Sequence, residues 1–245
     1  MINFMVANLQ EKKGLYRRIN KKRLLSMLKT QIENSLDVGW NKEKILVMSN
    51  FDFEFMGVKT HQCELNNTCL TGSKMFGLLI AFEQGLITEE VWSHDLDAWQ
   101  NIWFESPEFL DVGVVPYYES FYHGASVFFR PGTKHIVTEI VDRVTRKNTS
   151  REEPSLNRVL KSKKYKDRVT VLDNTYNVGC TRFVKRYMKS EKPVRVCHFR
   201  PFRRIAWRTF VLDSNNIFNG ENPVSVRLEK IMRKYFPGLA TEFKK

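Results

Sequence analysis

The chain has 245 residues, of which 42% are hydrophobic and 13% aromatic, enough for one large α/β domain with a full core. The formal net charge of +13 at pH 7 favours polyanionic partners: nucleic acid, an anionic membrane surface or phosphorylated substrates. No apolar run reaches the about 18 residues of a spanning helix, and the start of the sequence lacks the pattern of a signal peptide. We therefore expect a soluble, cytoplasmic protein.

The cysteines favour thiols in a reducing compartment. Cys63, Cys69, Cys180 and Cys197 form no Cys-x-x-Cys pair and have no histidines at zinc spacing. A Cys63–Cys69 disulfide is the alternative.

The first fifty residues predict a βαβ unit. Residues 1–8, ending in Ala7 and Asn8, are typical of a short buried strand. Apolar residues recur at helical spacing over 17–36, and Gly39 ends that helix. Residues 44–49 form a second buried strand. Strand, helix and strand in this order imply a parallel sheet.

The next elements lead to two neighbouring carboxylates. Residues 72–86 are a strongly apolar helix, and the following strand runs out into His94-Asp95-Leu96-Asp97. Carboxylates at the carboxyl end of a strand lie where open α/β sheets bind ligands. Asp95 and Asp97 repel each other unless positive charge neutralises them, and a hard divalent cation is the usual solution. A solvated loop is the alternative.

The rest of the chain continues the alternation of strands and helices. We expect strands at 112–117, 126–130, 169–172 and 194–199, helices at 133–146 and 152–160, and a short tail helix at 224–235. We expect a core domain over 1–212, with halves 1–97 and 98–212, and a basic C-terminal helical extension over 213–245 packed on the core.

Five segments in this order resemble the GT-A fold glycosyltransferases, which use nucleotide-diphospho-sugars. The segments are HDLDAWQ, similar to the DxD metal motif; YHGASVFFR, similar to the strand under the donor sugar; EEPSLNRVL, similar to the acceptor-side helix; VLDNTYNVG; and VCHF, similar to the strand with a metal-binding histidine. His123 and Glu152 depart from the residues common at their positions. The resemblance implies an α/β, Rossmann-like GT-A fold with a mixed, mainly parallel central sheet flanked by helices.

The resemblance also implies a metal site and a sugar-nucleotide donor. Asp97 would bind the divalent metal directly, Asp95 through water or by holding the ribose, and His198 as a third ligand. Mn²⁺ suits such an oxygen and imidazole shell better than Ca²⁺ does, and Mg²⁺ is the other candidate. The donor would be a UDP-sugar whose diphosphate leaves with the help of the metal. A core histidine is the alternative reading of His198.

Further residues are candidates for donor and acceptor contacts. Ala7 and Asn8 would line the base and ribose, and Gly124 would lie under the sugar. Lys74 and Arg17 (or Arg18) are candidates for the phosphates, with plain surface charge as the alternative. Glu153 is the first candidate for the acceptor-side catalytic carboxylate and Glu152 the second. A glutamate that only complements the helix dipole is the alternative.

The acceptor is predicted from the uneven spread of charge. Residues 182–208 hold ten basic residues against one acid, with aromatic residues interleaved. Such a surface suits a phosphate backbone and base stacking. The candidate nucleic-acid contacts are Arg182, Lys185, Arg186, Arg200, Arg203 and Arg204.

This pattern resembles the transferases that add glucose, arabinose or another sugar to hydroxymethylated pyrimidines, such as 5-hydroxymethylcytosine, in double-stranded bacteriophage DNA. Such an enzyme would work in the host cytoplasm. Two alternatives stay open: a glycosyltransferase with a lipid or polysaccharide acceptor, and a non-catalytic nucleic-acid-binding protein.

Overall fold

The computed structural model describes residues 1–9, 21–65, 73–118, 121–147, 151–179, 183–201 and 224–237. Contacts divide the chain into two compact units built from interleaved segments. The first unit holds Met1–Lys21, Asn41–Asp95 and Glu105–Leu172, and the second holds Lys22–Trp40, Leu96–Phe104 and Asp173–Lys245. The contiguous boundaries predicted at 97 and 212 stay a prediction.

The first unit is built on a mixed sheet. In the described part of the chain it has eight strands: β1 (Ile2–Ala7), β2 (Ile45–Ser49), β3 (Glu54–Phe55), β4 (Val58–Gln62), β5 (Val91–His94), β7 (Val112–Tyr118), β8 (Phe121–Phe129) and β9 (Val169–Val171). Their order is β3-β4-β2-β1-β5-β8-β7-β9. Strands β4, β2, β1 and β5 run parallel, and β8 runs antiparallel to both β5 and β7. The predicted fold class, a mixed and mainly parallel sheet, is confirmed.

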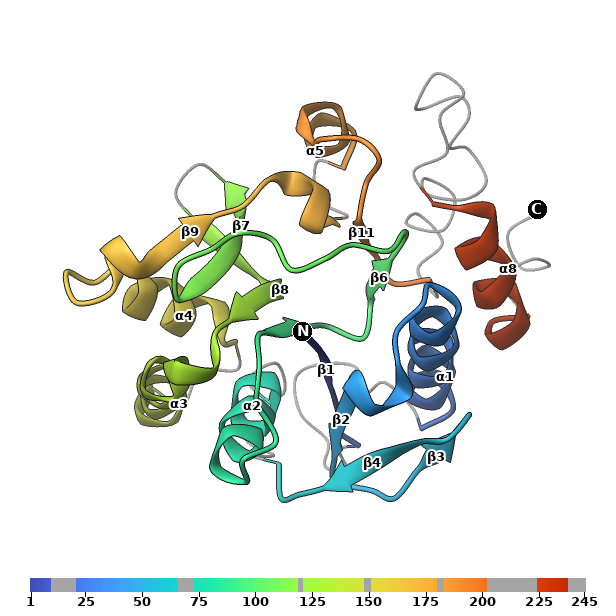
Figure 1. Cartoon of the computed structure of the whole chain (residues 1–245), viewed down its shortest axis with the longest axis horizontal. Coiled ribbons are helices and arrows are strands. Elements are labelled where there is room, and N and C mark those ends of the chain that lie inside the picture. The colour runs from blue at the N-terminus through green and yellow to red at the C-terminus, as the bar shows by residue number, and fades with distance from the viewer. Residues whose placement is uncertain are drawn as a thin grey trace. The chain divides into compact units, whose positions relative to one another are not determined.

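Three helices cover one face of this sheet: α2 (Ser73–Glu83), α3 (Lys134–Lys147) and α4 (Glu153–Leu160) (Figure 1). Alternate strand residues such as Ile2 and Phe4 point into the core that these helices close. Helix α2 approaches β1 closely, because a Cβ on Gly77 would lie 2.7 Å from Cγ2 of Val6. The hydrophobic core therefore fixes where α2 and α4 begin, and both beginnings carry site residues.

Short elements complete the first unit. They are the 3-10 helices η1 (Lys42–Lys44), η2 (Pro131–Thr133) and η3 (Lys166–Arg168). The β3–β4 hairpin, which the sequence analysis did not predict, turns through Met56 and Gly57, both with positive φ.

The second unit has its own small sheet. Its elements are α1 (Lys21–Asp37, whose first residue belongs to the first unit), β6 (Ala98–Gln100), η4 (Asn174–Tyr176), β10 (Val178–Gly179), α5 (Phe183–Lys189), β11 (Val196–His198) and α8 (Val226–Tyr235). Strand β11 lies in the centre, parallel to β10 and antiparallel to β6. The register sets His198 opposite both Gly179 and Ala98. The sequence analysis predicted only β11 of these strands.

A buried polar face on α1 holds the segment that contains Asp97. Gln31 is 1% exposed, and its Nε2 donates to the carbonyl oxygens of Leu96 at 3.1 Å and Ala98 at 2.8 Å. Asn34 Nδ2 donates to the carbonyl oxygen of Gln100 at 2.9 Å. These amides give the chain on both sides of Asp97 partners that it would otherwise lack in a buried position.

The tail helix predicted at 224–235 forms as α8. Leu228, Ile231 and Met232 are buried, and Lys234 pairs with Glu33 of α1 at 2.8 Å. None of the helices within the described ranges combines the length and apolar character that crossing a membrane requires.

We predict that Gln31→Met, which keeps the side-chain length, lowers the free energy of unfolding by about 1–3 kcal/mol, because two buried carbonyl groups lose a donor. Urea denaturation measures this change. Lys22→Met on the exposed side of the same helix is the control, with a change within about 0.5 kcal/mol. Equal changes in the two variants would contradict the assigned role of Gln31.

Candidate active site

Asp95 is held at the carboxyl end of β5 by its backbone. Its N–H donates to the carbonyl oxygen of Ala125 at 3.0 Å. Its carbonyl oxygen lies 3.0 Å from Nδ1 of His94, whose Nε2 lies 2.6 Å from Oδ1 of Asn3 on β1. The His94 ring is 1% exposed and stacks on Trp92 with 3.9 Å between ring centroids. The carboxylate of Asp95 therefore leaves a rigid strand end.

Lys74 lies between two carboxyl groups of the first unit. It is the second residue of α2 and only 6% exposed, and its Nζ lies 2.6 Å from Oδ1 of Asp95 and 3.2 Å from Oε1 of Glu152. It also donates to the carbonyl oxygen of Gly124. Burial alone lowers the pKa of Lys74, but the two carboxyl groups raise it well above its ordinary value. Lys74 is therefore a permanently charged ammonium group.

Glu152 is a buried carboxyl group that keeps its proton. Its side chain is 3% exposed, and burial raises its pKa to about 8, with Lys74 opposing that rise and Asp95 and Glu153 adding to it. At neutral pH the charge of Lys74 is then balanced by Asp95, and Glu152 is neutral. Oε2 of Glu152 has no hydrogen-bond partner within the described residues. A protonated carboxyl group is a hydrogen-bond donor as well as an acceptor.

The glycine of the YHGAS segment makes this arrangement possible. A Cβ on Gly124 would lie 2.9 Å from Oε1 of Glu152 and 3.2 Å from Cγ of Glu153. Asn157 fixes α4 against the same strand: its Oδ1 accepts from the Tyr122 N–H at 2.7 Å, and its Nδ2 donates to the Tyr122 carbonyl oxygen at 2.9 Å. The YHGASVFFR strand and the EEPSLNRVL helix are therefore in direct contact.

Ala7 and Asn8 lie at the same edge of the sheet. Ala7 is the buried last residue of β1. Nδ2 of Asn8 donates to Oγ of Ser73, the first residue of α2, at 2.7 Å. The predicted residues Ala7, Asn8, Lys74, Asp95, Gly124, Glu152 and Glu153 are thus all found where β1, β5 and β8 meet the starts of α2 and α4.

The second unit holds Asp97 between an imidazole and a guanidinium group. Nε2 of His198 lies 3.3 Å from Oδ1 of Asp97, and Nε of Arg200 lies 3.0 Å from Oδ2. The Phe199 N–H donates to the Asp97 carbonyl oxygen at 2.9 Å, which continues the β6–β11 pairing. Burial alone raises the pKa of Asp97, but His198 and Arg200 lower it well below its usual range. Asp97 is therefore ionised.

Asp97 and His198 fit a divalent cation. Two ligands about 2.1 Å from an octahedral ion and at right angles to each other are about 3.0 Å apart, close to the 3.3 Å between Oδ1 of Asp97 and Nε2 of His198. Asp95, which precedes Asp97 by two residues in the chain, stays the predicted third ligand. A mixed set of carboxylates and one imidazole favours Mn²⁺ over Ca²⁺.

The predicted nucleic-acid contacts have different surroundings. Lys185 is exposed, as expected. Arg186 is only 7% exposed, and its Nη2 donates to Oδ1 of Asn174 at 3.2 Å, so it is a buried side chain rather than a surface one. Arg200 is bound to Asp97. Arg17, Arg182, Arg203 and Arg204 lie outside the described residues.

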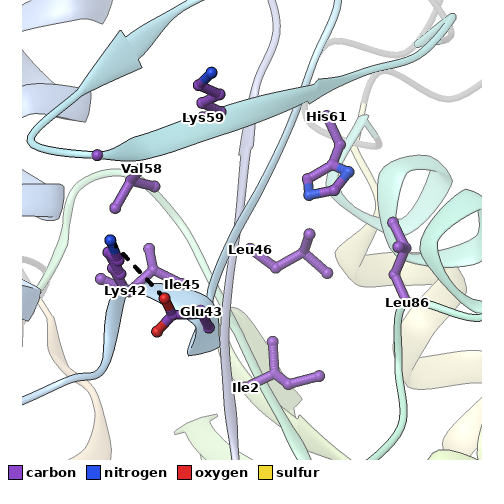
Figure 2. Close-up of a pocket in the computed structure, with 10 residues that line it drawn as sticks. Ile2, Lys42, Glu43, Ile45, Leu46, Val58, Lys59, His61 and Leu86 are labelled. Carbon is purple, nitrogen blue, oxygen red and sulfur yellow. Dashed lines mark ion pairs between the residues drawn. The ribbon is translucent and has the colours of Figure 1, made fainter.

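A pocket of about 500 Å³ lies at the opposite edge of the first sheet (Figure 2). Ile2, Ile45 and Leu46, at the starts of β1 and β2, form its wall with Val58 and Leu86. Its basic groups Lys42 and Lys59 have acidic neighbours, Glu43 at 3.9 Å and Glu54 at 3.3 Å. None of the predicted site residues lines this pocket, so we do not assign it to the site.

Several residues of the site escaped the sequence analysis. Gln31 and Asn34 lie within a helix whose apolar spacing alone was noted, and Arg200 was assigned to phosphate binding. A glutamine and an asparagine one turn apart on the helix face that also carries Leu24, Leu28 and Ile32 are the signal that was available. The pairing of Arg200 with Asp97, 103 residues away, leaves no local signal.

No family model and no curated protein matches the chain. Solved structures do match it. A glycosyltransferase involved in glycosylation of the major capsid of PBCV-1 is 14% identical, with a TM-score of 0.52 over 84% of this chain and 96% of that one. The glycosyltransferase GlyE of Streptococcus pneumoniae TIGR4 is 12% identical, with a TM-score of 0.54 over 89% of this chain and 63% of that one.

The galactosyltransferase LgtC, in complex with donor and acceptor sugar analogues, is 10% identical, with a TM-score of 0.53 over 94% of this chain and 100% of that one. At these identities the likeness is one of fold alone. The chain therefore has the fold of GT-A glycosyltransferases.

We predict that Glu152→Gln stabilises the protein relative to wild type increasingly as pH rises from about 5 to about 8. The folded pKa of about 8 lies above the ordinary value of 4.5, so the wild type loses stability as pH rises through this range. The slope is at most about 1.4 kcal/mol per pH unit. Urea denaturation at several pH values measures it, with Glu153→Gln as the matched control. A stability difference that does not change with pH would contradict the buried, protonated Glu152.

Proposed function

We propose that the protein is a metal-dependent glycosyltransferase that moves a sugar from a nucleotide-sugar, such as a UDP-sugar, to a hydroxyl group. The observation that carries this proposal is the 3.3 Å approach of Nε2 of His198, the last residue of β11, to Oδ1 of Asp97, the residue before the paired strand β6, in a chain with a glycosyltransferase fold. The two residues are 101 positions apart in the sequence, so the fold itself brings them together.

Asp97 and His198 would hold the divalent cation, with Asp95 as the third candidate ligand. When bound, the cation supplies a Lewis acid that neutralises the charge on a departing diphosphate. Arg200 keeps Asp97 ionised and oriented, because it occupies Oδ2 and leaves Oδ1 toward His198.

The residues of the first unit bind the donor. Ala7 and Asn8 line the base and ribose, and Gly124 leaves room for the sugar. Lys74 contributes a fixed positive charge beside Asp95, and the protonated Oε2 of Glu152 donates a hydrogen bond to a sugar hydroxyl. Arg17 stays a candidate for the phosphates.

Glu153 is the acceptor-side carboxylate. Glu152 carries a proton below pH about 8 and cannot accept one from an attacking hydroxyl group. Glu153 is partly exposed at the start of α4, next to Gly124, where an acceptor has access. Of the two predicted carboxylates, the surroundings therefore favour Glu153.

For the acceptor we propose a hydroxymethylated base, such as 5-hydroxymethylcytosine, in double-stranded DNA. The support is the net charge of +13 and the exposed lysines 185, 189 and 192 of the second unit. The hydroxymethyl group of such a base projects into the major groove, where a protein has access. A saccharide is the second candidate, favoured by the use of Arg186 and Arg200 in contacts inside the unit.

We predict that the protein hydrolyses a UDP-sugar slowly in the presence of Mn²⁺, and that Asp97→Asn lowers this rate about 100-fold or more, since Lewis-acid stabilisation is worth several kcal/mol. Asp37→Asn, which removes an exposed carboxylate of the second unit, is the control and keeps the rate. EDTA abolishes the activity of both wild type and control. A folded Asp97→Asn variant with unchanged turnover would refute the metal assignment.

The acceptor is tested by incubating the enzyme and UDP-glucose or a UDP-pentose with DNA that contains 5-hydroxymethylcytosine, with unmodified DNA and with an oligosaccharide. Mass spectrometry of the nucleosides and glycans identifies the product. We expect sugar on the hydroxymethylated DNA alone. Transfer only to the oligosaccharide would refute the DNA acceptor and leave the enzyme class intact.

A further inference from the structure

Arg200 begins from a fixed piece of backbone in the second unit. The residue before it, Phe199, is 0% exposed; its N–H donates to the carbonyl oxygen of Asp97 at 2.9 Å, and its carbonyl oxygen accepts from Nε1 of Trp99 at 2.7 Å. The residue after it is Pro201, which favours an extended backbone at Arg200. The contact between Arg200 and Asp97 is therefore anchored by the β6–β11 pairing, although the guanidinium group itself is partly exposed.

The two oxygens of the Asp97 carboxylate have different neighbours. Nε of Arg200 lies 3.0 Å from Oδ2, and Nε2 of His198 lies 3.3 Å from Oδ1. The Asp97 side chain is only 13% exposed, so solvent screens the guanidinium charge weakly at this point. A divalent cation beside Oδ2 would be repelled by Arg200, whereas a cation beside Oδ1 has an imidazole as a second ligand. The surroundings therefore favour a cation bound to one oxygen of this carboxylate.

The way in which a carboxylate binds distinguishes between metal ions. Ca²⁺ takes about six to eight oxygen ligands at about 2.3–2.6 Å and often uses both oxygens of one carboxylate. Mg²⁺ is smaller, requires octahedral geometry at about 2.0–2.1 Å and keeps several of its water ligands. Mn²⁺ also accepts octahedral geometry. The loss of one carboxylate oxygen is therefore a greater penalty for Ca²⁺ than for a small octahedral ion.

We propose that Arg200 is a specificity-determining residue of the metal site. It keeps Oδ2 of Asp97 from the cation and confines the cation to Oδ1 and the His198 ring, and so selects Mn²⁺ or Mg²⁺ against Ca²⁺. This inference rests on the proposed metal site and deepens it, because it assigns the choice of ion to a residue that is not a ligand. It also gives Arg200 a role other than the nucleic-acid contact predicted from the sequence.

The test is a competition between Ca²⁺ and Mn²⁺ for the full chain, with free Mn²⁺ measured by its electron paramagnetic resonance signal. UDP is present at one fixed concentration, so that its own metal binding is the same for every variant. We expect wild type to release Mn²⁺ only at a large excess of Ca²⁺. For Arg200→Met we expect the Ca²⁺ to Mn²⁺ affinity ratio to rise about tenfold, because Ca²⁺ gains a ligand oxygen.

Two further variants separate the choice of ion from a general effect of charge. Arg200→Lys keeps a positive donor beside Oδ2, and we expect it to keep the wild-type ratio. Arg227→Met removes a guanidinium that pairs with Asp37 of the same unit, and it is the matched control with an unchanged ratio. The loss of a positive charge alone strengthens the binding of both ions together, so it does not alter the ratio. If Arg200→Met does not fold, Arg200→Gln, which also removes the charge, takes its place.

The two proposals fail in different ways. Wild-type protein that binds no Mn²⁺ beyond that held by UDP overturns the metal site and the role of Arg200 with it. Wild-type protein that binds Mn²⁺, together with an Arg200→Met variant that has the wild-type affinity ratio, overturns the role of Arg200 alone. A shift of the same size in Arg227→Met would likewise overturn it.

Discussion

Two aspartates separated by one residue cannot both stay ionised without positive charge beside them, and this constraint organises the structure. Each carboxylate has its own counter-charge, from a different part of the chain. Lys74 lies 2.6 Å from Asp95 in the first unit, and Arg200 lies 3.0 Å from Asp97 in the second, where His198 adds an imidazole. In the first unit, the starts of α2 and α4 and the glycine of β8 surround the Lys74 contact. In the second unit, His198 at the end of β11 lies beside Asp97.

The same arrangement separates the protonation states of neighbouring acids. Burial raises the pKa of Glu152 to about 8, whereas His198 and Arg200 hold the pKa of Asp97 far below its usual range despite burial. One acid is thus a neutral hydrogen-bond donor and the other a permanent anion at the same pH. Carboxyl groups whose environments divide them in this way are typical of sites with distinct roles for each.

The candidate metal ligands are visible in the sequence because they lie at the ends of strands. Asp95 and Asp97 come directly after an apolar run, and His198 ends another, so both positions are visible in local sequence. The helices and the long strands were predicted for the same reason, because apolar periodicity is local. The fold class was predicted from these patterns together with the resemblance, and the structure confirms it.

The supporting contacts could not be predicted, since they join residues far apart in the chain. Gln31 reaches the segment of Asp97 across 65 residues or more, and Arg200 reaches Asp97 itself across 103. The charge of a basic cluster does not reveal which members are buried, and Arg186 is buried against Asn174. Strands of two or three residues, such as β6 and β10, are too short for a periodic pattern and depend on β11 for their pairing.

A crystal of the full chain grown with Mn²⁺ and UDP, measured at the manganese absorption edge, tests the central claim most directly. The account predicts one strong anomalous peak bonded to Oδ1 of Asp97 and Nε2 of His198, with the diphosphate on the same ion. An anomalous map without a peak at these two atoms, with UDP bound elsewhere, would contradict it.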